Sequence, residues 1–161
     1  MDRQRTFSWQ DPGAVAERAR TMSGLEFLRS IAGRQVAQAA PVAECLGFQL
    51  VEVEEGRVVF ELLPAEHHYN PIGSVHGGVL ATLCDSAAGA AVHSTLPRGV
   101  GYTTLEIKVS FVRGVGAATG VVRCEGRVLA AGSRVATAEA RLTDGAGKLF
   151  AHCTSTCLIL K

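Results

Sequence analysis

The residue types best suited to chemistry occur in one apolar segment near the middle of the chain. Residues 77–93 are apolar on nearly every side, which predicts a helix buried all round, and Asp85 places a carboxylate in its middle. A buried acid without a partner is unfavourable, and no basic residue lies one helical turn from Asp85. The predicted helix opens with His76-Gly77-Gly78, where free backbone N–H groups and the helix dipole favour a developing negative charge. An acid and an anion site on one helix together indicate catalysis.

The spacing of these groups predicts how the site is built. Gly77 and Asp85 are eight residues apart in the sequence. That separation corresponds to about 12 Å of helical rise, so one reacting carbonyl cannot contact both the Gly77 amide and the Asp85 carboxylate of the same chain. A two-fold dimer brings the helix start of one subunit near the middle of the other's helix, because its interface is self-complementary. We therefore predict a composite site, two per dimer.

Each candidate also has a purely structural interpretation. Asp85 could be a buried acid that accepts backbone hydrogen bonds, and His76 could only cap the helix. Cys84 lies beside Asp85, but consecutive helical residues point about 100° apart, so we interpret Cys84 as core packing. The spacing of His67, His68 and His76 fits no usual metal site, so we predict no metal and a solvated loop there.

The bulk properties exclude several classes of protein. A chain of 161 residues, 47% hydrophobic and 19% charged, predicts one globular domain that buries further surface in an oligomer. The formal net charge of +1 gives no support for a nucleic-acid partner. Five scattered cysteines without a CxxC pair predict free thiols in a reducing compartment. No signal-like or membrane-spanning run is present, so we expect a cytoplasmic protein without a membrane partner.

Capping residues and apolar spacing predict short helices before the sheet. We expect an arm over residues 1–10 and a helix from Asp11-Pro12 to about Arg20. A second helix starts with the capping box Ser23–Glu26 and fades before Pro41, and a helical turn after it ends at Gly47.

Period-two alternation predicts six strands around the buried helix. The predicted strands are 47–54, 57–63, 102–112, 117–131, 134–144 and 148–160. Strict alternation in the third strand puts Thr104 on the face opposite to its apolar residues, Leu105, Ile107, Val109 and Phe111. Small residues line one face of the next two strands, which lets a single helix pack closely. They are Ala118, Gly120, Val122, Cys124 and Gly126 in one strand, and Ala136, Ala138 and Ala140 in the other.

The pattern Asn70-x5-His76-Gly77-Gly78-x6-Asp85, with the strand 101–113 and the segment 132–148, resembles the hotdog-fold acyl-CoA thioesterases. It is most similar to their PaaI-type, phenylacetate-pathway branch. The resemblance covers about Cys45 to the C-terminus, leaving residues 1–40 as a helical N-terminal extension and 41–161 as the hotdog domain. It implies an α+β fold in which an antiparallel sheet of about six strands wraps around one central helix.

The resemblance also implies roles for individual residues. The Gly77 N–H polarises the thioester carbonyl, and Asp85 of the facing subunit acts as general base on water or as nucleophile. Asn70 and His76 orient the water or the carbonyl, and Thr104 assists the acid. Some relatives carry a helper threonine one turn after the acid, and here that place is Gly89.

Coenzyme A is implied as part of the substrate, and no separate cofactor is expected. Gly78 at the helix start is a substrate-binding candidate, and Arg113 and Arg134 are candidates for pairing with the CoA phosphates. Where relatives often have proline after the first arginine, this chain has Gly114.

The function implied is hydrolysis of an acyl-CoA thioester by a homodimer, or by a homotetramer of paired dimers. One alternative is a hotdog protein that binds acyl-CoA without catalysis. Another is a hotdog enoyl-CoA hydratase, although Asn70-Pro71 is not part of an acid-x-Asn-Pro-x-His pattern.

Overall fold

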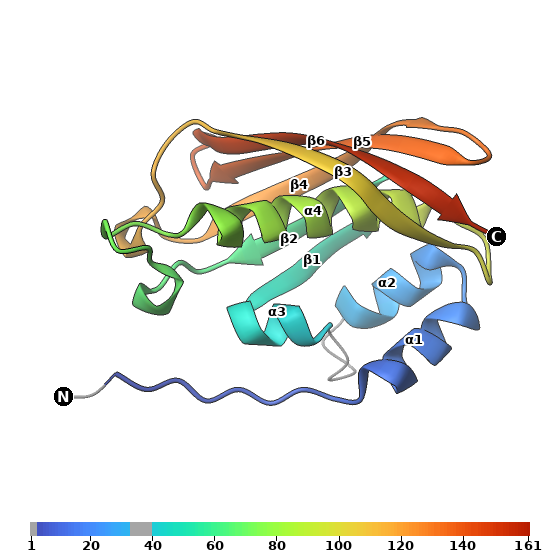
Figure 1. The fold of residues 1–161 in the computed structure, drawn as a ribbon, viewed down its shortest axis with the longest axis horizontal. Coiled ribbons are helices and arrows are strands. Elements are labelled where there is room, and N and C mark those ends of the chain that lie inside the picture. The colour runs from blue at the N-terminus through green and yellow to red at the C-terminus, as the bar shows by residue number, and fades with distance from the viewer. Residues whose placement is uncertain (1–2, 33–39) are drawn as a thin grey trace.

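One antiparallel sheet wraps around a long central helix in the computed structural model, which describes residues 3–32 and 40–161 (Figure 1). The helices are α1 (Pro12–Arg20), α2 (Gly24–Ala32), α3 (Pro41–Leu46) and α4 (Gly77–Ser94), with short 3-10 turns η1 (Glu66–His68) and η2 (Ala117–Thr119). The strands are β1 (Phe48–Glu54), β2 (Arg57–Leu62), β3 (Gly101–Phe111), β4 (Val122–Ala131), β5 (Val135–Asp144) and β6 (Leu149–Leu160). The predicted fold class, six antiparallel strands around one helix, is confirmed.

The strand order is β1-β2-β4-β5-β6-β3, so β1 and β3 form the two edges of the sheet. Every pair of neighbouring strands is antiparallel. The β1–β2 hairpin turns at Glu55-Gly56, as predicted, and Gly56 has a φ of 75°. Helix α4 enters between β2 and β3 in the sequence and lies across the concave side of the sheet, in contact with every strand.

The N-terminal helices start where their capping residues predict. The Asp11 carboxylate accepts a hydrogen bond from the Gly13 N–H at 2.9 Å, at the start of α1. The capping box before α2 is formed, because the Ser23 N–H donates to Glu26 Oε2 at 2.9 Å and the Glu26 N–H to Ser23 Oγ at 3.3 Å. The predicted end of this second helix, before Pro41, falls on residues 33–39, outside the described residues.

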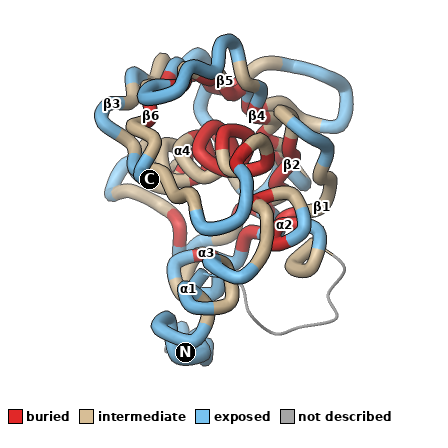
Figure 2. The backbone as a smooth tube through the Cα atoms, turned by 90° about the vertical axis from the view of Figure 1, so that its right-hand side faces the viewer, coloured by how far each residue is buried: buried red, intermediate tan, exposed pale blue. Residues whose placement is uncertain are grey.

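Helix α4 is largely buried within the curve of the sheet (Figure 2), and β4 and β5 approach it closely because they carry small residues on this side. A Cβ added to Gly126 on β4 would lie 2.1 Å from the carbonyl oxygen of Ala87, so helix and strand backbones are in direct contact there. Ala136, Ala138 and Ala140 on β5 are all buried against the same core. The predicted small-residue face of the two strands is confirmed within the strands themselves.

The N-terminal end of the chain covers the far end of α4. A Cβ on Gly24, at the start of α2, would lie 1.7 Å from the His93 carbonyl oxygen. The Gly24 N–H donates to the Leu96 carbonyl at 3.0 Å. Helix α2 therefore packs on α4 and β1 and closes the core beyond the last turn of α4.

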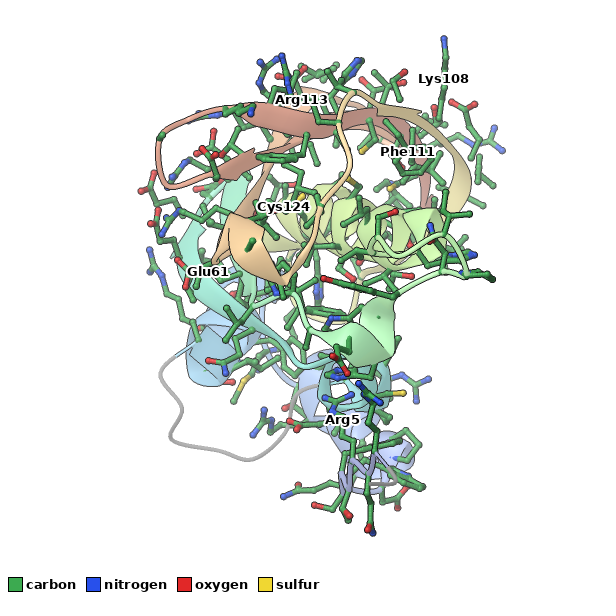
Figure 3. All side chains as sticks on the ribbon, turned by 90° about the vertical axis from the view of Figure 1, so that its left-hand side faces the viewer. Arg5, Glu61, Lys108, Phe111, Arg113 and Cys124 are labelled. Atoms are coloured by element: carbon green, nitrogen blue, oxygen red, sulfur yellow. The ribbon has the colours of Figure 1, made fainter. Side chains whose placement is uncertain are left out.

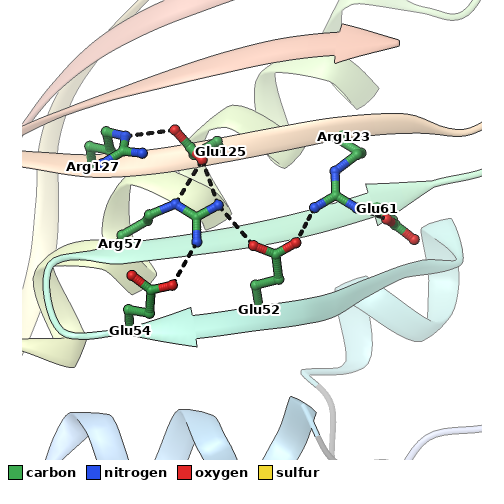
Figure 4. Close-up of polar contacts among 7 residues, drawn as sticks. All are labelled: Glu52, Glu54, Arg57, Glu61, Arg123, Glu125 and Arg127. Atoms are coloured by element: carbon green, nitrogen blue, oxygen red, sulfur yellow. Dashed lines mark hydrogen bonds and ion pairs between the residues drawn. The ribbon is translucent and has the colours of Figure 1, made fainter. Parts of the chain in front are cut away.

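The convex side of β1, β2 and β4 carries a network of charged side chains (Figure 4). Arg57 pairs with Glu52 at 2.8 Å, Glu54 at 3.1 Å and Glu125 at 2.7 Å. Hydrogen bonds from Arg57 and Arg123 lower the pKa of Glu52. These long side chains also shield Val59 on the same face, which is 1% exposed. The network gives β2, which carries Val59 on this face, a charged outer surface.

Strict alternation along β3 was the wrong expectation. Thr104 pairs with Cys157 and Glu106 with the next residue of β6, Thr156, so Leu105 is an extra residue in a β-bulge. The bulge turns Thr104 toward α4 and leaves Leu105 57% exposed on the outside.

Two further predictions are corrected by the structure. Residues 117–119 form η2 rather than the start of a strand, and Gly120 at φ 75° follows it, so β4 begins at Val122. His68 is 3% exposed rather than part of a solvated loop. Its Nδ1 accepts from the Ala65 N–H at 3.0 Å and its Nε2 donates to the Leu46 carbonyl at 2.7 Å, which satisfies both ring nitrogens.

The contact between α4 and β4 can be tested by adding one carbon atom. Gly126→Ala places its Cβ on the Ala87 carbonyl, and we expect a loss of about 1–3 kcal/mol in the free energy of unfolding, or about 2–12 °C in Tm. Gly145→Ala is the matched control, because a Cβ there meets no atom within 4 Å. Thermal denaturation followed by circular dichroism measures both variants, and equal stability would contradict the close packing.

Candidate active site

Asp85 lies in the middle of α4 on the side that faces the edge strand β3. Its side chain is partly buried, and the Thr104 hydroxyl donates a hydrogen bond to Oδ1 at 3.0 Å. Within the described part of the chain, no hydrogen bond or ion pair engages Oδ2, and no arginine or lysine pairs with Asp85. The carboxylate therefore keeps one oxygen available for a ligand.

The first backbone N–H groups of α4 differ in whether they have a hydrogen-bond partner within the chain. His76 is the N-cap, and its Nδ1 accepts a hydrogen bond from the Gly78 N–H at 2.9 Å. The N–H groups of Val79 and Leu80 bond to the His76 carbonyl at 2.9 and 3.4 Å. Among the hydrogen bonds of the described residues, none uses the Gly77 N–H. Gly77 is thus the donor available at the positive end of the helix dipole.

A pocket of about 350 Å³ opens beside this helix start. The Phe111 ring forms one wall, and its Cζ would lie 3.2 Å from a Cβ added to Gly77. Phe111 and Arg113 lie at this end of the molecule, seen along α4 from its N-terminal end in Figure 3. The lining residues are Asn70, Ser74, Val75, Gly77, Leu80, Phe111, Val112, Arg113, Gly114 and Val115.

Two predicted site residues shape the pocket through hydrogen bonds. Asn70 Oδ1 accepts from the Ile72 and Ser74 N–H groups at 3.1 and 3.2 Å, and its Nδ2 donates to Ser74 Oγ at 3.2 Å. Asn70 therefore fixes the loop that leads into α4. Arg113 donates to the Leu149 carbonyl at 2.6 Å and forms no ion pair with a carboxylate of the described residues. Its cationic charge remains available for an anionic ligand.

The structure gathers the predicted residues into two separate places. Phe111, at the pocket, pairs with Ala151 of β6, whereas Thr104, at Asp85, pairs with Cys157. Gly77 and Asp85 lie in the same helix eight residues apart, about 12 Å along its axis, and Asp85 is absent from the lining of the Gly77 pocket. Arg134 lies beyond Asp85, where its carbonyl accepts from the Ile159 N–H at 2.9 Å.

Tyr102 is a residue that the sequence analysis missed. It lies two positions before Thr104 on β3, and a Cβ added to Gly89 would lie 2.7 Å from the Tyr102 hydroxyl oxygen. Gly89 therefore has no room for the threonine that some relatives carry. Burial, with a contribution from the Asp85 charge, raises the pKa of Tyr102. Strict alternation had placed this face of β3 opposite to the apolar residues Leu105, Ile107, Val109 and Phe111, which is why the pattern gave no signal.

Cys84 packs in the core, as predicted. Its sulfur lies 3.9 Å from that of Cys124, and both side chains are buried. Contact with the Cys124 thiol, together with burial, raises the pKa of Cys84. Contact with Cys84 and burial likewise raise the pKa of Cys153. A high pKa disfavours the thiolate, so Cys84 is a poor nucleophile despite its place beside Asp85.

Neither a metal site nor a membrane span is found in the described residues. No group of three or more histidine, cysteine, aspartate or glutamate side chains within residues 3–32 and 40–161 could hold a metal ion. The helices of these segments are all too short or too polar to cross a membrane.

Comparison with known proteins identifies the family. Residues 72–151 match the thioesterase superfamily. Human acyl-coenzyme A thioesterase 13 is 32% identical over 104 residues, which are 64% of this chain and 73% of that protein. The chain belongs to the thioesterase superfamily. This confirms the prediction of a thioester hydrolase. The hotdog, PaaI-like type is likewise confirmed.

Two further relatives show the range of the similarity. The 1,4-dihydroxy-2-naphthoyl-CoA hydrolase of Listeria monocytogenes is 29% identical over 116 residues, covering 72% of this chain and 91% of that protein. The structure of a phenylacetic acid degradation-related protein from Ralstonia eutropha superimposes with a TM-score of 0.71 at 29% identity, covering 84% of this chain and 98% of that one. The thioesterase thus resembles its relatives over most of their lengths.

The state of the thiols can be measured directly. Cys45 is partly buried, while Cys84, Cys124, Cys153 and Cys157 are buried, and the last also has a raised pKa because of its burial. We expect a colorimetric thiol reagent at neutral pH to modify only Cys45 in the folded protein, and all five after denaturation. Cys45→Ala is the control and should abolish the native reaction. Rapid modification of further thiols in the folded protein would contradict this assignment.

Proposed function

We propose that this thioesterase hydrolyses acyl-CoA thioesters to a free acid and CoA, at a site shared between two subunits. Gly77 of one subunit supplies the oxyanion donor and Asp85 of the other acts on water or on the thioester. The observation that carries the proposal is the separation, in one chain, of an unpaired helix-start amide from an unpaired carboxylate oxygen. The named activities of the human and Listeria relatives support the acyl-CoA substrate class.

Asp85 is arranged to accept a proton. Thr104 holds Oδ1, so a water hydrogen-bonded to Oδ2 can lose its proton to the carboxylate as its oxygen attacks the thioester carbonyl carbon. The carbon–sulfur bond then breaks, and the CoA sulfur leaves with that proton. In the second route an Asp85 oxygen attacks the carbonyl carbon, the carbon–sulfur bond breaks to release CoA thiolate, and water then hydrolyses the anhydride to the free acid and regenerated Asp85.

The Gly77 amide is arranged to stabilise the charge that develops on the carbonyl oxygen. It is the first residue of α4, it keeps its N–H unpaired among the described residues, and it faces the pocket. A backbone donor at a helix start is fixed in place before the reaction, so its stabilising effect needs no reorganisation. His76 and Asn70 contribute by holding the helix start and its loop.

Recognition of CoA is assigned to the two arginines. Arg113 lines the Gly77 pocket, and Arg134 lies at the Asp85 end of the sheet, so in a composite site they come from different subunits. A guanidinium pairs well with phosphate oxygens.

We also propose the homodimer, paired into a homotetramer, as the assembly, and the cytoplasm as the location, in keeping with the free cysteines of the described residues.

The activity is tested with a panel of short, long and aromatic acyl-CoAs and a thiol reagent. We expect release of CoA from at least one class, and Asp85→Asn should lower kcat by about 10²–10⁴-fold, because the amide cannot accept the proton. Circular dichroism and gel filtration should show unchanged folding and assembly. Glu106→Gln, on the outer face of β3, is the matched control and should keep full activity.

Other outcomes would select the alternatives. Binding of acyl-CoA without CoA release would favour a non-catalytic binding protein. Loss of the enoyl absorbance of an enoyl-CoA without thiol release would favour a hydratase. Wild-type activity in Asp85→Asn would make this residue part of the scaffold only.

The sharing of the site is tested by mixing two inactive variants. Gly77→Pro removes the N–H and suits the first helical position, since His76 is already extended (φ −61°, ψ 134°). Heterodimers with Asp85→Asn then contain one complete site, so random reassortment should restore about a quarter of wild-type activity. Gly77→Ala adds the same Cβ but keeps the N–H, and should retain far more activity than Gly77→Pro. No recovery on mixing would place both groups in one chain's site.

A further inference from the structure

Tyr102 is the aromatic side chain of β3 that lies next to Asp85. It packs partly buried against the core, with its ring 5.6 Å from that of His93 and its hydroxyl oxygen 2.7 Å from where a Gly89 Cβ would be. Gly89 follows Asp85 by four residues, so both lie on one face of α4, about 6 Å apart along its axis. Tyr102 and Thr104 both point from β3 to this face.

The Tyr102 hydroxyl has no hydrogen-bond partner among residues 3–32 and 40–161. No hydrogen bond joins it to another residue of the described segments, whereas the Thr104 hydroxyl beside it is bonded to Asp85. It is also not sealed from solvent, because the one sealed side-chain nitrogen or oxygen without a partner in these segments is Arg18 Nε. A hydroxyl that solvent reaches, beside a carboxylate with an unpaired oxygen, can share one bridging water with that carboxylate.

We infer that Tyr102 positions the attacking water together with Asp85, an assignment that rests on the proposed hydrolysis. One O–H of the water donates to Asp85 Oδ2 and the other to the Tyr102 oxygen, which leaves a lone pair of the water directed at the thioester carbonyl. The proton goes to Asp85, and Tyr102 keeps its own. A water that donates hydrogen bonds of about 2.8 Å to two oxygens bridges roughly 4–5 Å between them, which is close to the roughly 5.4 Å pitch of the helix from which both oxygens are reached.

Gly89 makes room for the Tyr102 hydroxyl. Any side chain at this position would occupy the place of the Tyr102 hydroxyl, since even a Cβ comes within 2.8 Å of Cε2 and 3.1 Å of Cζ as well. The absence of a side chain on the helix therefore admits a hydroxyl from the strand. A hydroxyl returned to residue 89 should replace it only when the tyrosine ring is removed.

The first test removes the hydroxyl alone. Tyr102→Phe keeps the ring and its packing, so we expect unchanged Tm and KM but a kcat lower by about 3–10-fold, the effect of one hydrogen bond. Steady-state kinetics with the best acyl-CoA of the panel measures the split between kcat and KM. A kcat equal to wild type would overturn the inference, because the ring would then be only a wall.

The second test moves the hydroxyl to the helix. In the Tyr102→Ala background, Gly89→Ser returns a hydroxyl near its original place, whereas Gly89→Ala returns bulk without a hydroxyl. We expect kcat in the serine double variant to exceed that in the alanine double variant by about 3-fold or more. Equal kcat values in two folded double variants would overturn the inference. If either double variant fails to fold, Tyr102→Phe decides.

Failure of this inference is distinguishable from failure of the proposed function. Active wild type, inactive Asp85→Asn and fully active Tyr102→Phe would overturn the role of Tyr102 alone. A wild-type protein that releases no CoA from any acyl-CoA would overturn both.

Discussion

The direct contact between the backbone of α4 and the backbone of β4 constrains the rest of the molecule. Where Gly126 meets the Ala87 carbonyl, no side chain fits between helix and sheet, so β5 also presents alanines to this side. A helix held this closely cannot carry large or charged residues toward β4 and β5. The candidate catalytic groups of α4 lie away from this contact, in its first turn and on the side facing the edge strand β3.

Local sequence signals were sufficient for most of the fold. The capping residues Asp11 and Ser23, the left-handed Gly47 that ends α3, and the alternation along most of β6 are signals that lie within a few residues of each other in the sequence. The errors concern features set by distant partners. The bulge at Leu105 exists through the register of β3 against β6, and the burial of His68 depends on the Leu46 carbonyl, 22 residues away.

The candidate site was predictable to the same extent and for the same reason. The separation of Gly77 from Asp85 follows from helical rise alone, and the absence of a nearby base on α4 follows from the sequence. The pocket wall at Phe111 depends on the β3–β6 register, and the hydrogen bond between Thr104 and Asp85 depends on the bulge. Tyr102 was missed because its orientation is set by that same bulge.

The extra residue in β3, Leu105, reverses the alternation of side-chain directions between the two halves of the strand. Up to Thr104 the even-numbered residues face α4, and from Ile107 onward the odd-numbered ones do. Deletion of Leu105 would join the two halves into a regular strand in which Thr104, Glu106 and Ile107 alternate, so Tyr102 and Thr104 would still face α4. The bulge thus lets one strand present Tyr102 and Thr104 to α4 at one end and Ile107 and Val109 at the other, which strict alternation of the same residues does not allow.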